Sequence, residues 1–174
     1  ADENRLTQLA GNPQGSSEDV ELLISFLDSD EPSTFRDQAT AILSAMTGTG
    51  VDATIREALQ EMEGPEDGRI LLIDVIRDRE IGDAFANVLR IFKETSNQAE
   101  RASALGALSV ITRDYDVKNL LPLLGGSLSN QDRTQIENVI AKVLLADGSI
   151  EARVAPVLGA ISTTDGDERR SLSR

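Results

Sequence analysis

The chain has 174 residues, contains neither cysteine nor histidine, and carries a formal net charge of −13 at pH 7. The missing residue types exclude disulfide bonds, thiolate nucleophiles, imidazole bases and the common zinc sites. The acidic balance argues against duplex nucleic acid as a partner, because phosphate binding needs a basic surface. Aromatic residues make up only 3% of the chain, so the core must be built from Leu, Ile, Val and Ala, which favours thin helical layers.

The negative charge is concentrated in the first half of the chain. Residues 1–83 hold 19 acidic residues against six arginines, whereas the 11 acidic and 11 basic residues of 84–174 cancel. This asymmetry predicts a basic protein partner for the first half. The alternative is that the charge serves solubility alone.

The sequence predicts a soluble protein but leaves its compartment open. No apolar run approaches 18 residues, so we expect no membrane span. The opening residues, ADENRLTQ, have neither the basic nor the apolar region of a signal peptide. A cytoplasmic location and a secreted or periplasmic one after removal of a signal peptide are both compatible with a chain that has no cysteine.

Residues 1–16 are predicted to be an N-terminal tail or a partial cap. A short helix is expected at Asn4–Ala10, before a break that is rich in Gly, Asn and Pro. The end of a repeat array exposes an apolar face, and such a helix would cover it.

The first repeat unit, residues 17–49, is predicted to contain two helices. Ser16–Asp19 has the polar and acidic residues of a helix start, and the apolar residues after it recur with helical spacing. Pro32 is expected at the first position of the second helix. Thr47–Gly50 is the predicted turn out of the unit.

Four further units follow the same plan, and their approximate bounds are 50–79, 80–114, 115–147 and 148–174. In the second unit the run ILLIDVI would also suit a β-strand, but the period and the Pro65-Glu66-Asp67 start favour a helix. The fifth unit is incomplete, because Arg169–Arg174 is too short for a stable helix. Either the array continues in a longer protein or a neighbouring molecule packs on this end.

An arginine stands early in the second helix of each unit, and successive arginines are 33, 32, 32 and 36 residues apart. A period near 33 indicates a stack of similar units. The five residues are Arg36, Arg69, Arg101, Arg133 and Arg169. We expect each to join its unit to an acid in the adjacent turn, such as Asp30, Glu66 or Asp132. Alternatively, the arginines would form a ladder that binds an acidic peptide or phosphate.

This pattern resembles HEAT-type repeats, in the short form found in many bacterial proteins. The matching stretches include Asp30-Glu31-Pro32 with Arg36, Pro65-Glu66-Asp67 with Arg69, and Asp132-Arg133 with Ile136. The resemblance implies an all-α fold: a right-handed α-solenoid, or armadillo-like superhelix, of about five antiparallel helix pairs over residues 17–174. It also implies that the second helices line a concave groove used for protein contacts.

The acids on the second unit are the candidate partner-binding residues. An acidic first half would steer a basic partner to the groove, and the residues that we expect to contact it lie at the turn and along the second helix. They are Glu63, Glu66, Asp67, Asp74 and Asp78.

The remaining motifs do not predict a catalytic, cofactor or metal site. Asp74 and Asp78 share a helix face and could hold a cation or act as acid and base, but no loop surrounds them. Asp165–Glu168 lacks the ligand spacing of a calcium loop. Gly48-Thr49-Gly50 lacks the lysine of a phosphate loop.

The sequence therefore predicts a non-catalytic protein–protein interaction or scaffold module. One alternative is a passive spacer domain within a larger protein. The other follows from the resemblance, because short repeats of this kind occur in the lyases that attach bilins to phycobiliproteins. The net charge and the lack of His and Cys argue against that activity.

Overall fold

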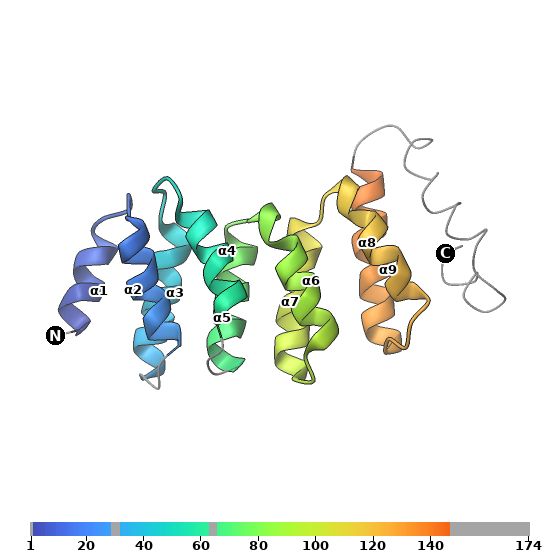
Figure 1. Cartoon of the computed structure of the whole chain (residues 1–174), viewed down its shortest axis with the longest axis horizontal. Coiled ribbons are helices and arrows are strands. Elements are labelled where there is room, and N and C mark those ends of the chain that lie inside the picture. Colours follow the sequence, from blue (N-terminus) through green and yellow to red (C-terminus); the bar gives the residue numbers. More distant parts are fainter. Residues whose placement is uncertain (1, 29–31, 63–65, 147–174) are drawn as a thin grey trace. The chain divides into compact units, whose positions relative to one another are not determined.

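The computed structural model describes residues 2–28, 32–62 and 66–146, and all regular structure in these residues is helical (Figure 1). The prediction of an all-α fold is confirmed. The fifth predicted unit, including Arg169, lies outside the described residues. The elements are α1 (Asp2–Ala10), α2 (Ser17–Leu27), α3 (Ser33–Ala45), α4 (Val51–Glu61), α5 (Glu66–Asp78), a 3-10 turn (Gly82–Ala84), α6 (Phe85–Glu94), α7 (Gln98–Ile111), a second 3-10 turn (Asp114–Asp116), α8 (Val117–Leu124) and α9 (Asn130–Leu145).

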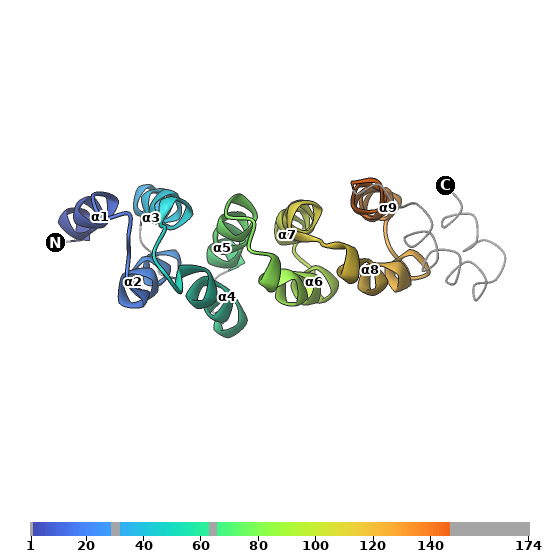
Figure 2. The ribbon, with the colours of Figure 1, turned by 90° about the horizontal axis from the view of Figure 1, so that it is seen from above.

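The chain divides into two compact units, residues 1–111 and residues 112–174. In the first unit, helices α1, α3, α5 and α7 lie in one row and α2, α4 and α6 in another (Figure 2). Consecutive helices pack as pairs, α2 with α3, α4 with α5 and α6 with α7, and neighbours within each row are also in contact. The first unit is therefore a two-layer stack of helix pairs.

Helix α5 lies at the centre of the first unit. It contacts α2, α3, α4 and α7, and Leu72, Ile73, Val75 and Ile76 are all fully buried. A helix that is covered on most of its sides has to be apolar over most of its surface. This explains the run at 70–76, for which the β-strand alternative was wrong.

The helix starts follow the predicted capping signals closely. The side chain of Ser16 accepts a hydrogen bond from the backbone N–H of Asp19, whose carboxylate accepts one in return from the backbone of Ser16. The start of α3 differs from the prediction by one residue. Pro32 precedes the helix in an extended conformation, with φ −51° and ψ 141°, and Ser33 is the first helical residue.

Arg79 ties the ends of three helices together, although the period did not single it out. Its side chain is only 10% exposed and lies 2.6 Å from the carboxylate of Asp52, at the start of α4. It also donates hydrogen bonds to the backbone carbonyls of Leu43 and Met46, at the end of α3. The last carbonyls of a helix lack partners within the helix, so this guanidinium satisfies groups that would otherwise be buried without a donor.

In the second unit, α8 and α9 pack against each other. Their contact is made by aliphatic side chains, and Ser129 caps α9 by accepting a hydrogen bond from the backbone of Asp132. Asp116 is buried where α8 begins and accepts a hydrogen bond from the backbone of Arg113. Burial raises the pKa of the Asp116 carboxyl group above its ordinary value. The hydrogen bond from the backbone of Arg113 and the positive charge of its side chain favour the ionised form, but they only partly offset the loss of hydration. The buried core residues are Val117, Leu120, Leu124, Ile136, Val139 and Ile140.

Gly68 allows the first turn of α5 to approach the end of α2. A Cβ atom at this position would lie 2.4 Å from the carbonyl oxygen of Leu27. That oxygen belongs to the backbone and cannot rotate away, so any larger residue must push the two helices apart.

We therefore expect Gly68→Ala to destabilise the protein by about 1–3 kcal/mol, the usual cost of overpacking, in urea denaturation. Gly106→Ala in α7 is the matched control. Its new Cβ atom would have Arg77 Nη1 at 3.9 Å as its nearest neighbour, so the higher helix propensity of alanine should leave stability unchanged or raise it by up to about 1 kcal/mol. Equal effects of the two substitutions would contradict the close approach.

Candidate functional site

The described repeat arginines have different partners from one unit to the next. Arg101 donates a hydrogen bond to the backbone carbonyl of Thr95 and lies 5.2 Å from the ring centroid of Phe92. Arg133 donates to the carbonyls of Leu124 and Gly126. In both cases the guanidinium reaches the end of the first helix of its own unit, where a cation is favoured.

Carbonyl oxygens were not the partners that the sequence predicted. A carboxylate in an adjacent turn, such as that of Asp132, was expected because a stack of repeats needs hydrogen bonds between its units. The hydrogen bonds of Arg133 to the end of α8 provide instead a link within one unit. Asp30, the expected partner of Arg36, lies outside the described residues.

Arg36 lines a small hollow between α3 and α5 of about 240 Å³, together with Asp67 and Ile70. Its Nε atom is buried and has no hydrogen-bond partner in the described part of the chain. Asp67 is exposed at the start of α5. Among the candidate partner-binding residues whose side chains the structure describes, Asp67 is the one that shares a hollow with a repeat arginine.

The other candidate acids do not form one continuous site with Asp67. Asp74 and Asp78 lie toward the far end of α5 and both pair with Arg77, at 2.8 and 3.1 Å. Asp74 also accepts a hydrogen bond of 3.0 Å from the hydroxyl of Ser103 in α7. The negative charges of Asp74 and Asp78 are therefore partly neutralised by Arg77 of the same helix. Glu63 and the side chain of Glu66 lie outside the described residues.

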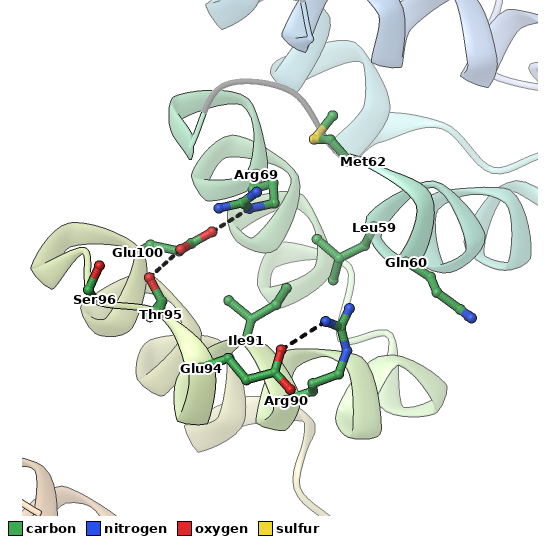
Figure 3. A pocket seen from close by; sticks show the side chains of 10 residues that line it. All are labelled: Leu59, Gln60, Met62, Arg69, Arg90, Ile91, Glu94, Thr95, Ser96 and Glu100. Atoms are coloured by element: carbon green, nitrogen blue, oxygen red, sulfur yellow. Dashed lines mark hydrogen bonds and ion pairs between the residues drawn. The ribbon is translucent and has the colours of Figure 1, made fainter.

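A larger hollow of about 420 Å³ lies where the ends of α4 and α6 meet the starts of α5 and α7 (Figure 3). We refer to it as the α4/α6 hollow. Leu59 and Ile91 lie in its middle, between Arg69 on one side and Arg90 on the other (Figure 3). Its lining consists of Leu59, Gln60, Met62, Arg69, Arg90, Ile91, Glu94, Thr95, Ser96 and Glu100.

The packing of the first helices explains why the stack opens at this point. Helix α2 packs on both α4 and α5, whereas α4 contacts α6 less extensively and its contact with α7 is sparse at most. Sequence reasoning did not find this hollow, because the lining residues come from four helices and share no motif. The only signal was Arg69, which the period had singled out for another reason.

Glu100 and Arg69 form a buried ion pair that joins α5 to α7. Arg69 Nε lies 2.6 Å from Glu100 Oε1, and the two side chains are 24% and 1% exposed. The second carboxylate oxygen accepts a hydrogen bond from the hydroxyl of Thr95. This pair links adjacent units, as predicted for the arginines, but the acid lies in the next second helix and not in a turn.

Glu100 is held in its charged form. Burial alone would raise its pKa, but the hydrogen bonds from Arg69 and Thr95 and the charge of Arg69 outweigh burial and lower the pKa below the ordinary value. A carboxylate with a lowered pKa and both oxygens hydrogen-bonded is a poor proton acceptor at neutral pH. Glu100 therefore holds the guanidinium group of Arg69 in place in the lining of the α4/α6 hollow.

Arg90 and Glu94 form the second ion pair of the hollow, and it is of a different kind. Arg90 Nη1 lies 3.1 Å from Glu94 Oε2, one helical turn further along α6, and the side chains are 48% and 64% exposed. Exposed pairs with this spacing stabilise a helix by only about 0.3–0.5 kcal/mol. Either partner is therefore available to an incoming group.

The described part of the chain has neither a cluster of metal ligands nor a membrane-spanning helix. Within residues 2–28, 32–62 and 66–146, no three acidic side chains gather closely enough to hold a metal ion. None of the helices described in those ranges is both long and apolar enough to cross a membrane.

Comparison of the chain with protein families, with curated proteins and with solved structures gives no match. The arrangement of the described residues is therefore the basis of any functional proposal.

Replacing Arg69 alone should be costly, because it leaves the carboxylate of Glu100 buried without its cation. We expect Arg69→Met to lower the free energy of unfolding by about 3 kcal/mol, measured by urea denaturation. The double variant Arg69→Met/Glu100→Leu should regain most of this loss, since two apolar side chains need no charge partner. Arg56→Met, which breaks the partly exposed pair with Glu57, should cost about 0.5 kcal/mol or less.

The lowered pKa of Glu100 also predicts a pH dependence. Above a pH of about 5 the carboxylate is ionised in both states and its contribution to stability is complete. As the pH falls, the unfolded chain binds the proton first, so this contribution is lost by the time the pH reaches the lower pKa of the folded state. Unfolding of Glu100→Gln should therefore depend less on pH below 5 than unfolding of the parent chain. Glu57→Gln, a change at an exposed residue, should keep the parent slope, and a shared slope for all three proteins would refute the assignment.

Proposed function

We propose that this chain is a non-catalytic protein-binding domain that contacts its partner through the row of second helices α3, α5 and α7. The observation that supports this most strongly is the side-by-side packing of these three helices, with α5 between α3 and α7. Helices that begin 65 residues apart in the sequence, at Ser33 and Gln98, thereby contribute to one face, which a partner can contact as a unit.

The chemistry of this face favours a basic partner. The exposed residues of α3, α5 and α7 are mainly small or polar, and the exposed charges among their described side chains are those of Asp37, Asp67 and Asp78. Arg77 offsets one acid of its cluster with Asp74 and Asp78 and leaves that cluster with an acidic excess. Complementary charge accelerates association and suppresses wrong partners.

We further propose that the helix pairs belong to a HEAT-type α-solenoid. The pairs α2/α3, α4/α5, α6/α7 and α8/α9 recur with the period of the arginines, and short pairs of this kind bury a continuous core only by stacking. The right-handed superhelix and its concave groove are part of this proposal. Small-angle X-ray scattering of the whole chain tests it, because a solenoid gives an elongated particle and two units that collapse on each other give a compact one.

The binding face is testable with four exposed alanines, two in each row of helices. Ala41 and Ala102 lie on α3 and α7, and Ala53 and Ala86 lie on α4 and α6. Each is replaced in turn by p-benzoylphenylalanine, and the protein is irradiated in a lysate of its source organism. We expect one protein to be crosslinked from positions 41 and 102 and not from 53 and 86.

The lysate experiment also addresses the alternative functions. Crosslinking of equal strength from all four positions would contradict the proposed face. An absence of specific crosslinks from every position would favour a passive spacer over a binding domain. In a positive case, Asp67→Asn combined with Asp78→Asn should weaken crosslinking from position 41, because it removes two of the charges that attract a basic partner.

A further inference from the structure

We propose that the side of α3 next to α1 is a helix-binding site. Helix α1 fills this site as a built-in ligand, and an amphipathic helix of a partner protein can take its place. Helix α1 lies beside α3 at the end of the row that α1, α3, α5 and α7 form (Figure 2). The site lies between α1 and α3, and it does not rest on the function proposed for the face of α3, α5 and α7.

Two leucines attach α1 to the stack. Leu6 and Leu9 are 1% and 9% exposed and lie one turn apart on the same side of the helix. Among the described helices, α1 packs mainly against α3. The other described side chains of α1 are all exposed, and four of the five are polar: Asn4, Arg5, Thr7, Gln8 and Ala10. Helix α1 therefore shows which ligand the site accepts, namely an amphipathic helix with the pattern Leu-x-x-Leu.

The attachment of α1 is weak compared with that of the central helix. Helix α1 has nine residues, and isolated helices shorter than about 12 residues are only marginally stable in water. Its order therefore depends on the burial of Leu6 and Leu9, whereas α5 buries the four apolar side chains at positions 72, 73, 75 and 76 completely. Segments with few buried apolar contacts open locally while the rest of a protein stays folded. We therefore expect α1 to leave α3 without unfolding of the stack.

The connection after α1 is held by contacts of its own. The backbone N–H and the hydroxyl of Thr47 both donate a hydrogen bond to the carbonyl oxygen of Pro13, at 2.7 and 3.2 Å. Gly48 lets the backbone at Gln14 come close, because a Cβ atom at position 48 would collide with the carbonyl oxygen of Gln14. None of these contacts involves the two leucines. Helix α1 can therefore leave while the connection stays bound at the end of α3.

The helix that replaces α1 must bind better than α1 does. The short connection keeps α1 near its site at an effective concentration on the order of millimolar. The α1 helix of a second copy would make the same contacts without this advantage, so it cannot compete. A helix of more than about 12 residues is more stable by itself and can bury additional apolar side chains along α3. The expected partner is therefore a protein that presents such a helix, with leucines along one side.

The test compares three forms of the whole chain by methyl NMR. Leu6→Asp/Leu9→Asp places two charges in the contact and should release α1. Thr7→Asp/Gln8→Asp is the matched control, because it places the same charges at exposed positions of the same helix. The methyl signals of Leu43 in α3 report binding, and those of Ile73 in α5 report whether the stack stays folded.

The probe is a synthetic helix of 16 residues that is closed by side-chain lactam bridges. Its leucines continue the spacing of Leu6 and Leu9 along one side, and its other residues are polar. A second peptide with glutamine in place of every leucine is the control. Hydrogen exchange of the parent chain provides a measurement that needs no variant.

We expect the leucine peptide to shift the Leu43 signals and to bind Leu6→Asp/Leu9→Asp at least tenfold more tightly than the parent chain or Thr7→Asp/Gln8→Asp. The reason is that α1 no longer competes for the site. The glutamine peptide should cause no shift. In the parent chain, the amides of residues 6–10 should exchange at least tenfold faster than those of residues 39–45.

Several results would overturn the proposal. They are equal affinity for the three forms, no binding to Leu6→Asp/Leu9→Asp, and exchange of α1 in step with α3. Loss of the Ile73 signals in Leu6→Asp/Leu9→Asp would show instead that the stack depends on α1. Dimerisation of this variant in sedimentation would identify a second copy of the chain, and not a partner helix, as the occupant.

Discussion

The arrangement of the first unit depends on the enclosure of α5. Helix α5 has neighbours in both rows of helices. Its charged side chains therefore lie at its two ends and along the one stripe that stays accessible to solvent. Arg69 at the start pairs with Glu100 of α7, while Arg79, just past the end, binds the carbonyls of α3 and the carboxylate of Asp52. Gly68 lets the same helix start against the end of α2. Helix α5 is thus held along its length by the burial of its apolar side chains and at its ends by charged groups, in a fixed place between α3 and α7.

Much of the fold was predictable because its signals are local. The helix start at Ser16 and the acidic first turns each occupy a few consecutive residues, and together with the arginine period they predict the succession of helix pairs, but not every helix boundary. Pro32 shows the limit: its fixed φ suits both the first helical position and the residue before it, and the sequence does not distinguish them. The run at 70–76 was ambiguous for a related reason. A helix covered on most of its sides and a buried strand have a similar apolar composition, and it was the period and the Pro65-Glu66-Asp67 start that favoured the helix.

The candidate site was much less predictable, because it depends on contacts between units. Asp74 and Asp78 lie on one helix, as the sequence predicted, whereas Asp67 belongs to the helix and not to the turn before it. The neighbours of these acids were not predicted, because no pattern in the sequence indicates that Arg77 and Ser103 both bind Asp74. The arginines illustrate the same point. One period placed Arg69, Arg101 and Arg133 at equivalent positions, yet the first binds a carboxylate of the next unit and the third binds carbonyls of its own. Residues at equivalent positions of a repeat share a place on the helix, whereas the partner of each side chain depends on the residues that surround it.

The lengths of sequence between bonded side chains have a consequence for how the protein folds. Arg69 and Glu100 are 31 residues apart, Ser103 and Asp74 29, and Arg79 and the carbonyl of Leu43 36. Each separation is close to the length of one repeat, so each of these bonds closes a loop that is about one helix pair long. Loops of this length close at a modest cost in entropy, and contacts that are near in sequence form quickly. Folding of the first unit can therefore begin at α5 and spread outward in both directions, one helix pair at a time, without waiting for distant segments of the chain to meet.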